Sequence, residues 1–249
     1  MYHNLSPRTT RYILTALVTL CLCTSQAWAA KSKYEAGAVS NGGSIKGTIK
    51  AAAKADETVP ITKDNSFCGD SLPAEKYLIG SDGGLKNAVV KLEGITAGKA
   101  FDLPDPKISN TKCQFAPHVS VAQKKGMMVV DNQDPLLHNS HFYLVRVGKK
   151  NKNVINVALP KQGMELTKKK ILKKAGLLSL QCDAHDFMQA YIWVLEHPYG
   201  VVTGSDGSFE LTDVPAGSYK MTIWHEGLGE KVVDVTVEAG KATTIDHSF

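Results

Sequence analysis

The feature that most constrains the fold is the alternation of short apolar segments with turns beyond residue 30. Apolar and polar residues alternate along these segments, and Gly, Asn and Asp residues separate them. No long stretch has the periodicity of an amphipathic helix. The chain is therefore expected to be all-β, built of sandwiches or barrels. The expected strands lie at residues 119–123, 127–132, 141–147, 154–159, 177–182 and 189–195, with a hairpin turn at 124–126.

The first 29 residues have the order of a secretory signal peptide. Arg8 and Arg11 precede an apolar run at residues 13–23, and Ala27-Trp28-Ala29 offers a small-residue cleavage site. The run is short for a bilayer span. We expect a periplasmic or secreted protein with no membrane span in the mature chain, the alternative being a retained N-terminal anchor.

The C-terminal segment has a strand-and-turn motif at residues 203–219, TGSDGSFELTDVPAGSY. Tyr219, Met221 and Ile223 share one face of a strand there, as a half-buried strand requires. This motif resembles one that recurs in the carboxypeptidase regulatory-like domains, which are prealbumin-type β-sandwiches. The resemblance implies a stalk or interaction module that carries no chemistry.

That second small sandwich usually has seven strands, whereas residues 197–249 offer five. Residues 43–49 and 88–92 look like the two opening strands of the same family. One interpretation pairs the N-terminal β region, residues 30–98, with residues 197–249, so that a middle domain at 99–196 is inserted into a discontinuous sandwich. The other is a plain sequential order. Both stay open at this point.

Three cysteines remain once Cys21 and Cys23 leave with the signal peptide: Cys68, Cys113 and Cys182. Because the number is odd, at least one of these cysteines is not in a disulfide within the chain. If Cys182 has the metal role described next, Cys68 and Cys113 are expected to form a disulfide in an oxidising compartment.

A cluster of soft and borderline ligands lies in one short loop. Cys182, His185 and Met188 follow a C-x2-H-x2-M spacing between two apolar strands, and His138 in a loop upstream supplies a further imidazole. This donor set suits one copper ion better than zinc or magnesium. Two imidazoles and a thiolate with a weak axial thioether form the blue-copper, or type 1, electron-transfer site.

The middle of the chain resembles the cupredoxins, particularly the amicyanin and plastocyanin branch. Phe115-x-Pro117-x-Val119-x-Val121 matches the early strand of that family, and His138-Asn139 matches its first ligand. The resemblance implies a Greek-key β-sandwich over residues 99–196 and the ligands His138, Cys182, His185 and Met188. Asp186 departs from the frequent proline after the second histidine.

The neighbours of these residues have expected roles. Asn139 is expected to fasten the His138 loop to the Cys182 loop. His185 is expected to be the ligand nearest solvent, with an apolar collar of Leu136, Leu137 and Phe187 for a redox partner. His141 and His118 are expected to be packed or hydrogen-bonded histidines, with a metal contact as the alternative.

The leading hypothesis is an exported copper protein that carries single electrons between partners such as a cytochrome c or a dehydrogenase. A copper carrier or storage protein and a copper-dependent structural interaction protein are the alternatives. We expect no enzyme, because four ligands leave no open position for a substrate. The net charge of +5, which falls to +3 without Arg8 and Arg11, does not argue for nucleic acid.

Overall fold

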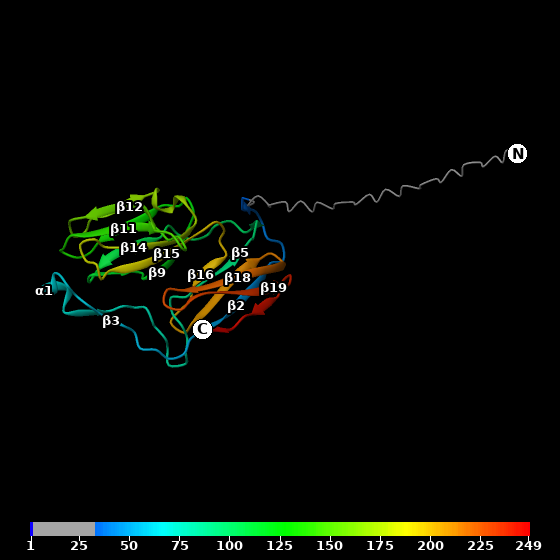
Figure 1. Ribbon diagram of the computed structural model, residues 1–249, viewed down its shortest axis with the longest axis horizontal. Coiled ribbons are helices and arrows are strands. Elements are labelled where there is room, and N and C mark those ends of the chain that lie inside the picture. The colour runs from blue at the N-terminus through cyan, green and yellow to red at the C-terminus, as the bar shows by residue number, and fades with distance from the viewer. Residues whose placement is uncertain (2–32) are drawn as a thin grey trace. The chain divides into compact units, whose positions relative to one another are not determined.

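The computed structural model describes Met1 and residues 33–249 (Figure 1). Within these residues, helix is confined to α1 (Asn65–Cys68) and the 3-10 turn η1 (Ile171–Lys173), and the other regular elements are strands. The predicted all-β class is therefore confirmed. The predicted signal peptide lies outside the described residues, apart from Met1. No helix in the described part of the chain is long and apolar enough to cross a membrane.

The first sandwich consists of two sheets that share one apolar core. Phe142, Leu180 and Ile192 of one sheet pack with Ile108 and Val130 of the other, and all five are fully buried. The alternation of buried and more exposed residues along 107–111 and 189–194 places one face of these strands on this core. In order, the five-stranded sheet contains β12 (Lys152–Leu159), β11 (His138–Leu144), β14 (Gly176–Gln181), β15 (Gln189–Leu195) and β9 (Val119–Gln123). The four-stranded sheet contains β13 (Glu165–Lys168), β10 (Met128–Asn132), β7 (Lys107–Thr111) and β8 (Gln114–Ala116).

Two details of the expected strands are wrong. Residues 124–126 do not form a hairpin, because β9 pairs with β15 whereas β10 pairs with β7 and β13. The turn carries the chain from one sheet to the other. The strand expected at 141–147 begins earlier, so that His138 is the first residue of β11 and pairs with Leu159. The hydrogen-bonded ladder therefore fixes His138 more firmly than a loop would.

The second sandwich joins segments from the two ends of the chain. Ile45 pairs with Leu211, and Val90 pairs with Ile223. Figure 1 shows β2 in blue among orange and red strands. One sheet contains β16 (Gly200–Val202), β5 (Val89–Glu93), β18 (Gly217–His225) and β19 (Gly229–Val237). The other contains β17 (Ser208–Val214), β2 (Gly43–Lys50) and β20 (Ala242–Thr244), with β21 (His247–Ser248) also on β2. Of the two open alternatives, the strand pairing is that of the discontinuous sandwich, while the exact domain boundaries stay a prediction.

The connection between β2 and β5 reaches the first sandwich. It contains β3 (Thr58–Pro60), α1 and β4 (Ser71–Pro73). Cys68 at the end of α1 is bonded to Cys113, with a Cα–Cα distance of 5.7 Å. The predicted disulfide is therefore confirmed, and Cys182 is the free cysteine of the described chain.

His197, just after β15, is expected to make the protein less stable in mild acid. Burial lowers the pKa of His197 from 6.5 to about 4, and Nδ1 accepts a hydrogen bond from the amide of Tyr199. Between these two pH values the unfolded chain binds a proton that the folded chain does not. The contribution of His197 to the free energy of unfolding is therefore fully present above pH 6.5, and about 3 kcal/mol of it is lost as the pH approaches 4. Urea unfolding of the wild type and of His197→Asn at pH 7 and pH 4.5 measures this, and equal losses in both proteins would contradict it.

Candidate metal centre

Cys182 lies directly after β14 and opens a short loop that ends at β15. The loop is tight because the amide of His185 donates to the carbonyl of Cys182 at 3.2 Å and the amide of Met188 donates to the carbonyl of His185 at 3.0 Å. The antiparallel pairing of β14 with β15 holds both ends of the loop. The C-x2-H-x2-M spacing therefore becomes two successive turns between paired strands.

His138 joins this loop from the neighbouring strand. The Sγ atom of Cys182 lies 3.7 Å from Nδ1 of His185 and 3.9 Å from Nδ1 of His138. The three donor atoms lie within 4.8 Å of one another, and all three residues are buried. Ligands that bind one metal ion at about 2.0 to 2.3 Å lie at such separations. Two imidazoles and a thiol around one point fit copper by donor type.

Asn139 connects the beginning of β11 to the Cys182 loop, as expected. Its amide lies 3.4 Å from Sγ of Cys182, and its side-chain oxygen accepts a hydrogen bond from the amide of Ala184 at 3.1 Å. Its side-chain nitrogen donates to Asn156. Burial raises the pKa of the Cys182 thiol, whereas the amides of Asn139, Ala184 and His185 oppose this rise. These amides supply partial positive charge where a metal-bound thiolate would need it.

Each imidazole is oriented by a carboxylate on its far nitrogen. Nε2 of His138 lies 2.9 Å from Oδ2 of Asp134, and Nε2 of His185 lies 2.9 Å from Oδ2 of Asp64. Such partners fix the tautomer, so that Nε2 carries the proton and Nδ1 keeps its lone pair for a metal. Burial lowers the pKa of His138 and so favours the neutral ring, although the hydrogen bond to Asp134 acts in the opposite direction. Both Nδ1 atoms face the sulfur and could bind a metal ion there.

His185 does not reach the surface. It is 1% exposed, as are Cys182 and Met188, because the segment that carries Asp64 covers its outer edge, and its place as the ligand nearest solvent stays a prediction. The expected collar is divided as well: Leu136 and Phe187 pack with the disulfide, whereas Leu137 is 50% exposed. No residue pattern in the sequence indicated that a segment from the β2–β5 connection would cover this edge.

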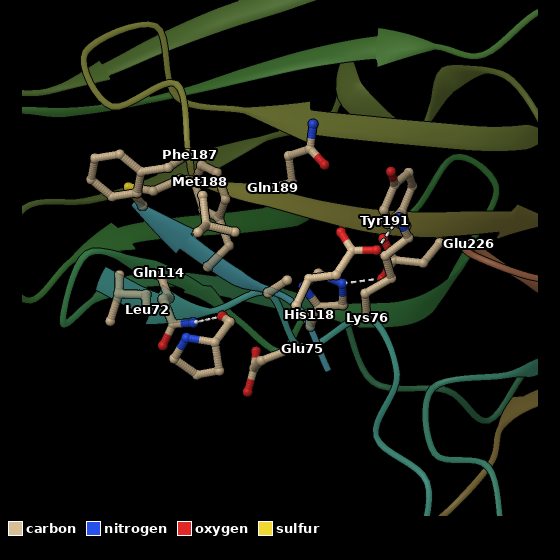
Figure 2. Close-up of a pocket in the computed structure, with 15 residues that line it drawn as sticks. Leu72, Glu75, Lys76, Gln114, His118, Phe187, Met188, Gln189, Tyr191 and Glu226 are labelled. Atoms are coloured by element: carbon tan, nitrogen blue, oxygen red, sulfur yellow. Dashed lines mark hydrogen bonds and ion pairs between the residues drawn. The ribbon is translucent and has the colours of Figure 1, made fainter. Parts of the chain in front are cut away.

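Met188 is 1% exposed and packs in the same core as Cys182. It also lines a cavity of about 210 Å³. Figure 2 shows Phe187 and Met188 at one end of this cavity, and His118 and Glu226 at the other. The axial role of Met188 stays a prediction.

The two other histidines considered from the sequence are occupied by hydrogen bonds. Nδ1 of His141 lies 2.9 Å from a carboxylate oxygen of Asp183, and its Nε2 lies 3.0 Å from Asn153. His118 pairs through Nε2 with Glu226. These contacts fit the interpretation as hydrogen-bonded histidines.

Sequence reasoning missed the two orienting carboxylates. Asp134 precedes His138 by four residues and could have been suspected, since a carboxylate near a ligand histidine is a frequent partner. Asp64 lies 121 residues from His185, and no local pattern relates the two.

Comparison with protein families finds a match in the C-terminal part. Residues 188–249 match the family model of the carboxypeptidase regulatory-like domain. The probable rhamnogalacturonate lyase B of Aspergillus flavus is 33% identical over 72 residues, which are 28% of this chain and 11% of the lyase. The chain therefore spans about a tenth of the length of this curated relative.

Solved structures similar to part of the chain include a cupredoxin, amicyanin variants and a copper-containing nitrite reductase. A purple cupredoxin from Nitrosopumilus maritimus is 17% identical, with 36% of this chain and all of the other covered at a TM-score of 0.31. A reduced amicyanin variant is 16% identical, with 38% and 87% covered at a TM-score of 0.31. A copper-containing nitrite reductase from Thermus scotoductus is 16% identical, with 39% and 24% covered at 0.30. At this similarity, the chemistry of the site rests on its own donor atoms.

Proposed function

We propose that this chain is an exported mononuclear type 1 copper protein that carries single electrons between redox partners. His138, Cys182 and His185 would hold the copper ion, and Met188 would be a fourth, weak ligand. The observation that carries the proposal is the buried thiol with two Nδ1 atoms at 3.7 and 3.9 Å. Bound copper would supply a one-electron change between Cu(I) and Cu(II).

The protein's own residues keep the ligands in place during such a change. Asp134 and Asp64 hold the two imidazole rings, and Asn139 holds the thiol loop to β11. Ligands that move little need little reorganisation when an electron arrives. Burial of the thiol and both histidines also keeps water from the metal. This arrangement suits an electron carrier better than a copper carrier, because a copper carrier must bind and release its metal readily.

The wider setting follows from the same proposal. A disulfide and the predicted signal peptide favour a periplasmic or secreted protein. The partner is a redox protein such as a cytochrome c or a dehydrogenase. Leu137, which is exposed and directly precedes the ligand His138, is the proposed contact for it. We also propose that the protein transforms no substrate.

The visible absorption spectrum of the protein loaded with Cu(II) tests the proposal. A thiolate bound to Cu(II) in this geometry gives an intense visible band, and the zinc-loaded protein is the control without it. A copper-bound protein without such a band would overturn the type 1 assignment and favour storage or a structural role.

Met188→Leu is expected to keep the visible band and raise the reduction potential. A thioether donates weakly to Cu(II), so its replacement by a hydrocarbon favours Cu(I). Spectroelectrochemistry measures the potential, and Met128→Leu is the matched control because Met128 is buried in the same core. An unchanged potential in Met188→Leu would remove Met188 from the ligand set.

A further inference from the structure

The segment 61–73, which we call the cap, contacts the metal-site loop through two polar side chains. Asp64 reaches Nε2 of His185 at 2.9 Å, and the hydroxyl of Thr62 donates to Oδ1 of Asp186 at 3.1 Å. The carboxylate of Asp186 therefore provides the second contact between the metal-site loop and the cap.

Asp64 is committed to His185 instead of to its own helix. It occupies the N-cap position of α1, where an aspartate side chain usually accepts a backbone hydrogen bond. No such bond forms here, and the backbone of Asp64 adopts a left-handed conformation with φ of 57°. Few residue types other than glycine adopt this conformation readily, although Asp and Asn are among them. The side chain of Asp64 therefore does not bond to the N-terminus of α1, and its carboxylate contacts the imidazole of His185 instead.

The disulfide connects the orienting groups of both imidazoles. The amide of Cys68 donates to the carbonyl of Asp64 at 3.0 Å, so this half of the disulfide lies one turn from the carboxylate on His185. The amide of Cys113 donates at 2.9 Å to Oδ2 of Asp134, the same oxygen that holds His138. Ile61, Cys68 and Cys113 form a small apolar cluster, so apolar contacts reinforce the covalent connection.

We propose that the cap closes the histidine edge of the metal site, that Asp64 is the positioning residue for His185, and that the Cys68–Cys113 disulfide holds the cap closed and slows metal exchange. This inference rests on the proposed copper site. The carboxylate fixes the ring with Nδ1 toward the sulfur and excludes water from Nε2. Electron exchange through an exposed edge of His185 is closed off, so the route to a partner runs elsewhere.

The first experiment needs no metal. Metal-free wild type, Asp64→Ala and Asp64→Asn are treated with diethyl pyrocarbonate, and peptide mass spectrometry follows modification of His185. We expect wild type to react slowest, Asp64→Ala at least about tenfold faster, and Asp64→Asn in between, because its amide oxygen still accepts a hydrogen bond. Asp70→Ala is the matched control, since Asp70 is exposed in the same segment. Equal rates in Asp64→Ala and Asp70→Ala would overturn the role of Asp64.

The second experiment measures the rate at which copper-loaded protein loses its metal to excess EDTA. We expect a loss about 10- to 100-fold faster in Asp64→Ala and in the double variant Cys68→Ala/Cys113→Ala than in Asp70→Ala. Circular dichroism shows whether the double variant folds, and Asp64→Ala decides the question if it does not. Rates within twofold of the control would overturn the slowing of exchange. A wild type without the type 1 band, but with His185 protected, would instead contradict the proposed function.

Discussion

Cys182→Ser is expected to abolish the visible band and electron transfer together. The band arises from the bond between a thiolate and Cu(II), which a serine hydroxyl cannot replace. The substitution is nearly isosteric and the side chain is 1% exposed, so the fold should survive. The measurements are the absorption spectrum of the Cu(II)-loaded protein and the rate of its reduction by a cytochrome c.

His138→Gln and His141→Gln provide a matched pair for the same test. Nδ1 of His138 faces Cys182, whereas both ring nitrogens of His141 bind other side chains. We expect His138→Gln to weaken copper binding strongly and His141→Gln to keep the band. A band that persists in Cys182→Ser, or that disappears only in His141→Gln, would place the metal elsewhere.

The sequence predicted the part of the site that depends on local spacing. Cys182, His185 and Met188 lie within seven residues, and the strands on both sides of them were recognised. His138 lies 44 residues upstream and is brought close because β11 pairs with β14, with His141 opposite Gln181. Its donor type, together with the resemblance of His138-Asn139 to the first ligand of the cupredoxins, was enough to nominate it.

The parts that could not be predicted depend on long-range packing. The alternation along β9 and β10 predicts which residues are buried but not which strands pair, and so the sequence alone predicts a hairpin at residues 124–126. The cover over His185 comes from the β2–β5 connection. Asp64 carries no pattern of its own that relates it to an imidazole 121 residues away.

Asp134→Ala is expected to cost about 3 to 5 kcal/mol of unfolding free energy in the metal-free protein. The carboxylate is 3% exposed and accepts hydrogen bonds from the amides of Lys112 and Cys113 at 2.7 and 2.9 Å, besides its contact with His138. Its removal leaves two buried donors, the amide of Cys113 and the ring of His138, without a partner, and each costs about 1 to 3 kcal/mol; the part-buried amide of Lys112 adds less. Asp134→Asn should cost less, because an amide oxygen can still accept.

The same substitution separates a structural role from a role at the metal. Urea unfolding of the metal-free protein gives the free energy, and Asp70→Ala, an exposed position, should change it by less than about 0.5 kcal/mol. Copper affinity should fall about 10- to 100-fold in Asp134→Asn, which stays folded but no longer holds His138 with a full negative charge. If Asp134→Ala is as stable as Asp70→Ala, the carboxylate does not stabilise the turn that contains Lys112 and Cys113. If Asp134→Asn binds copper like the wild type, the charge of Asp134 is not what prepares His138 as a ligand.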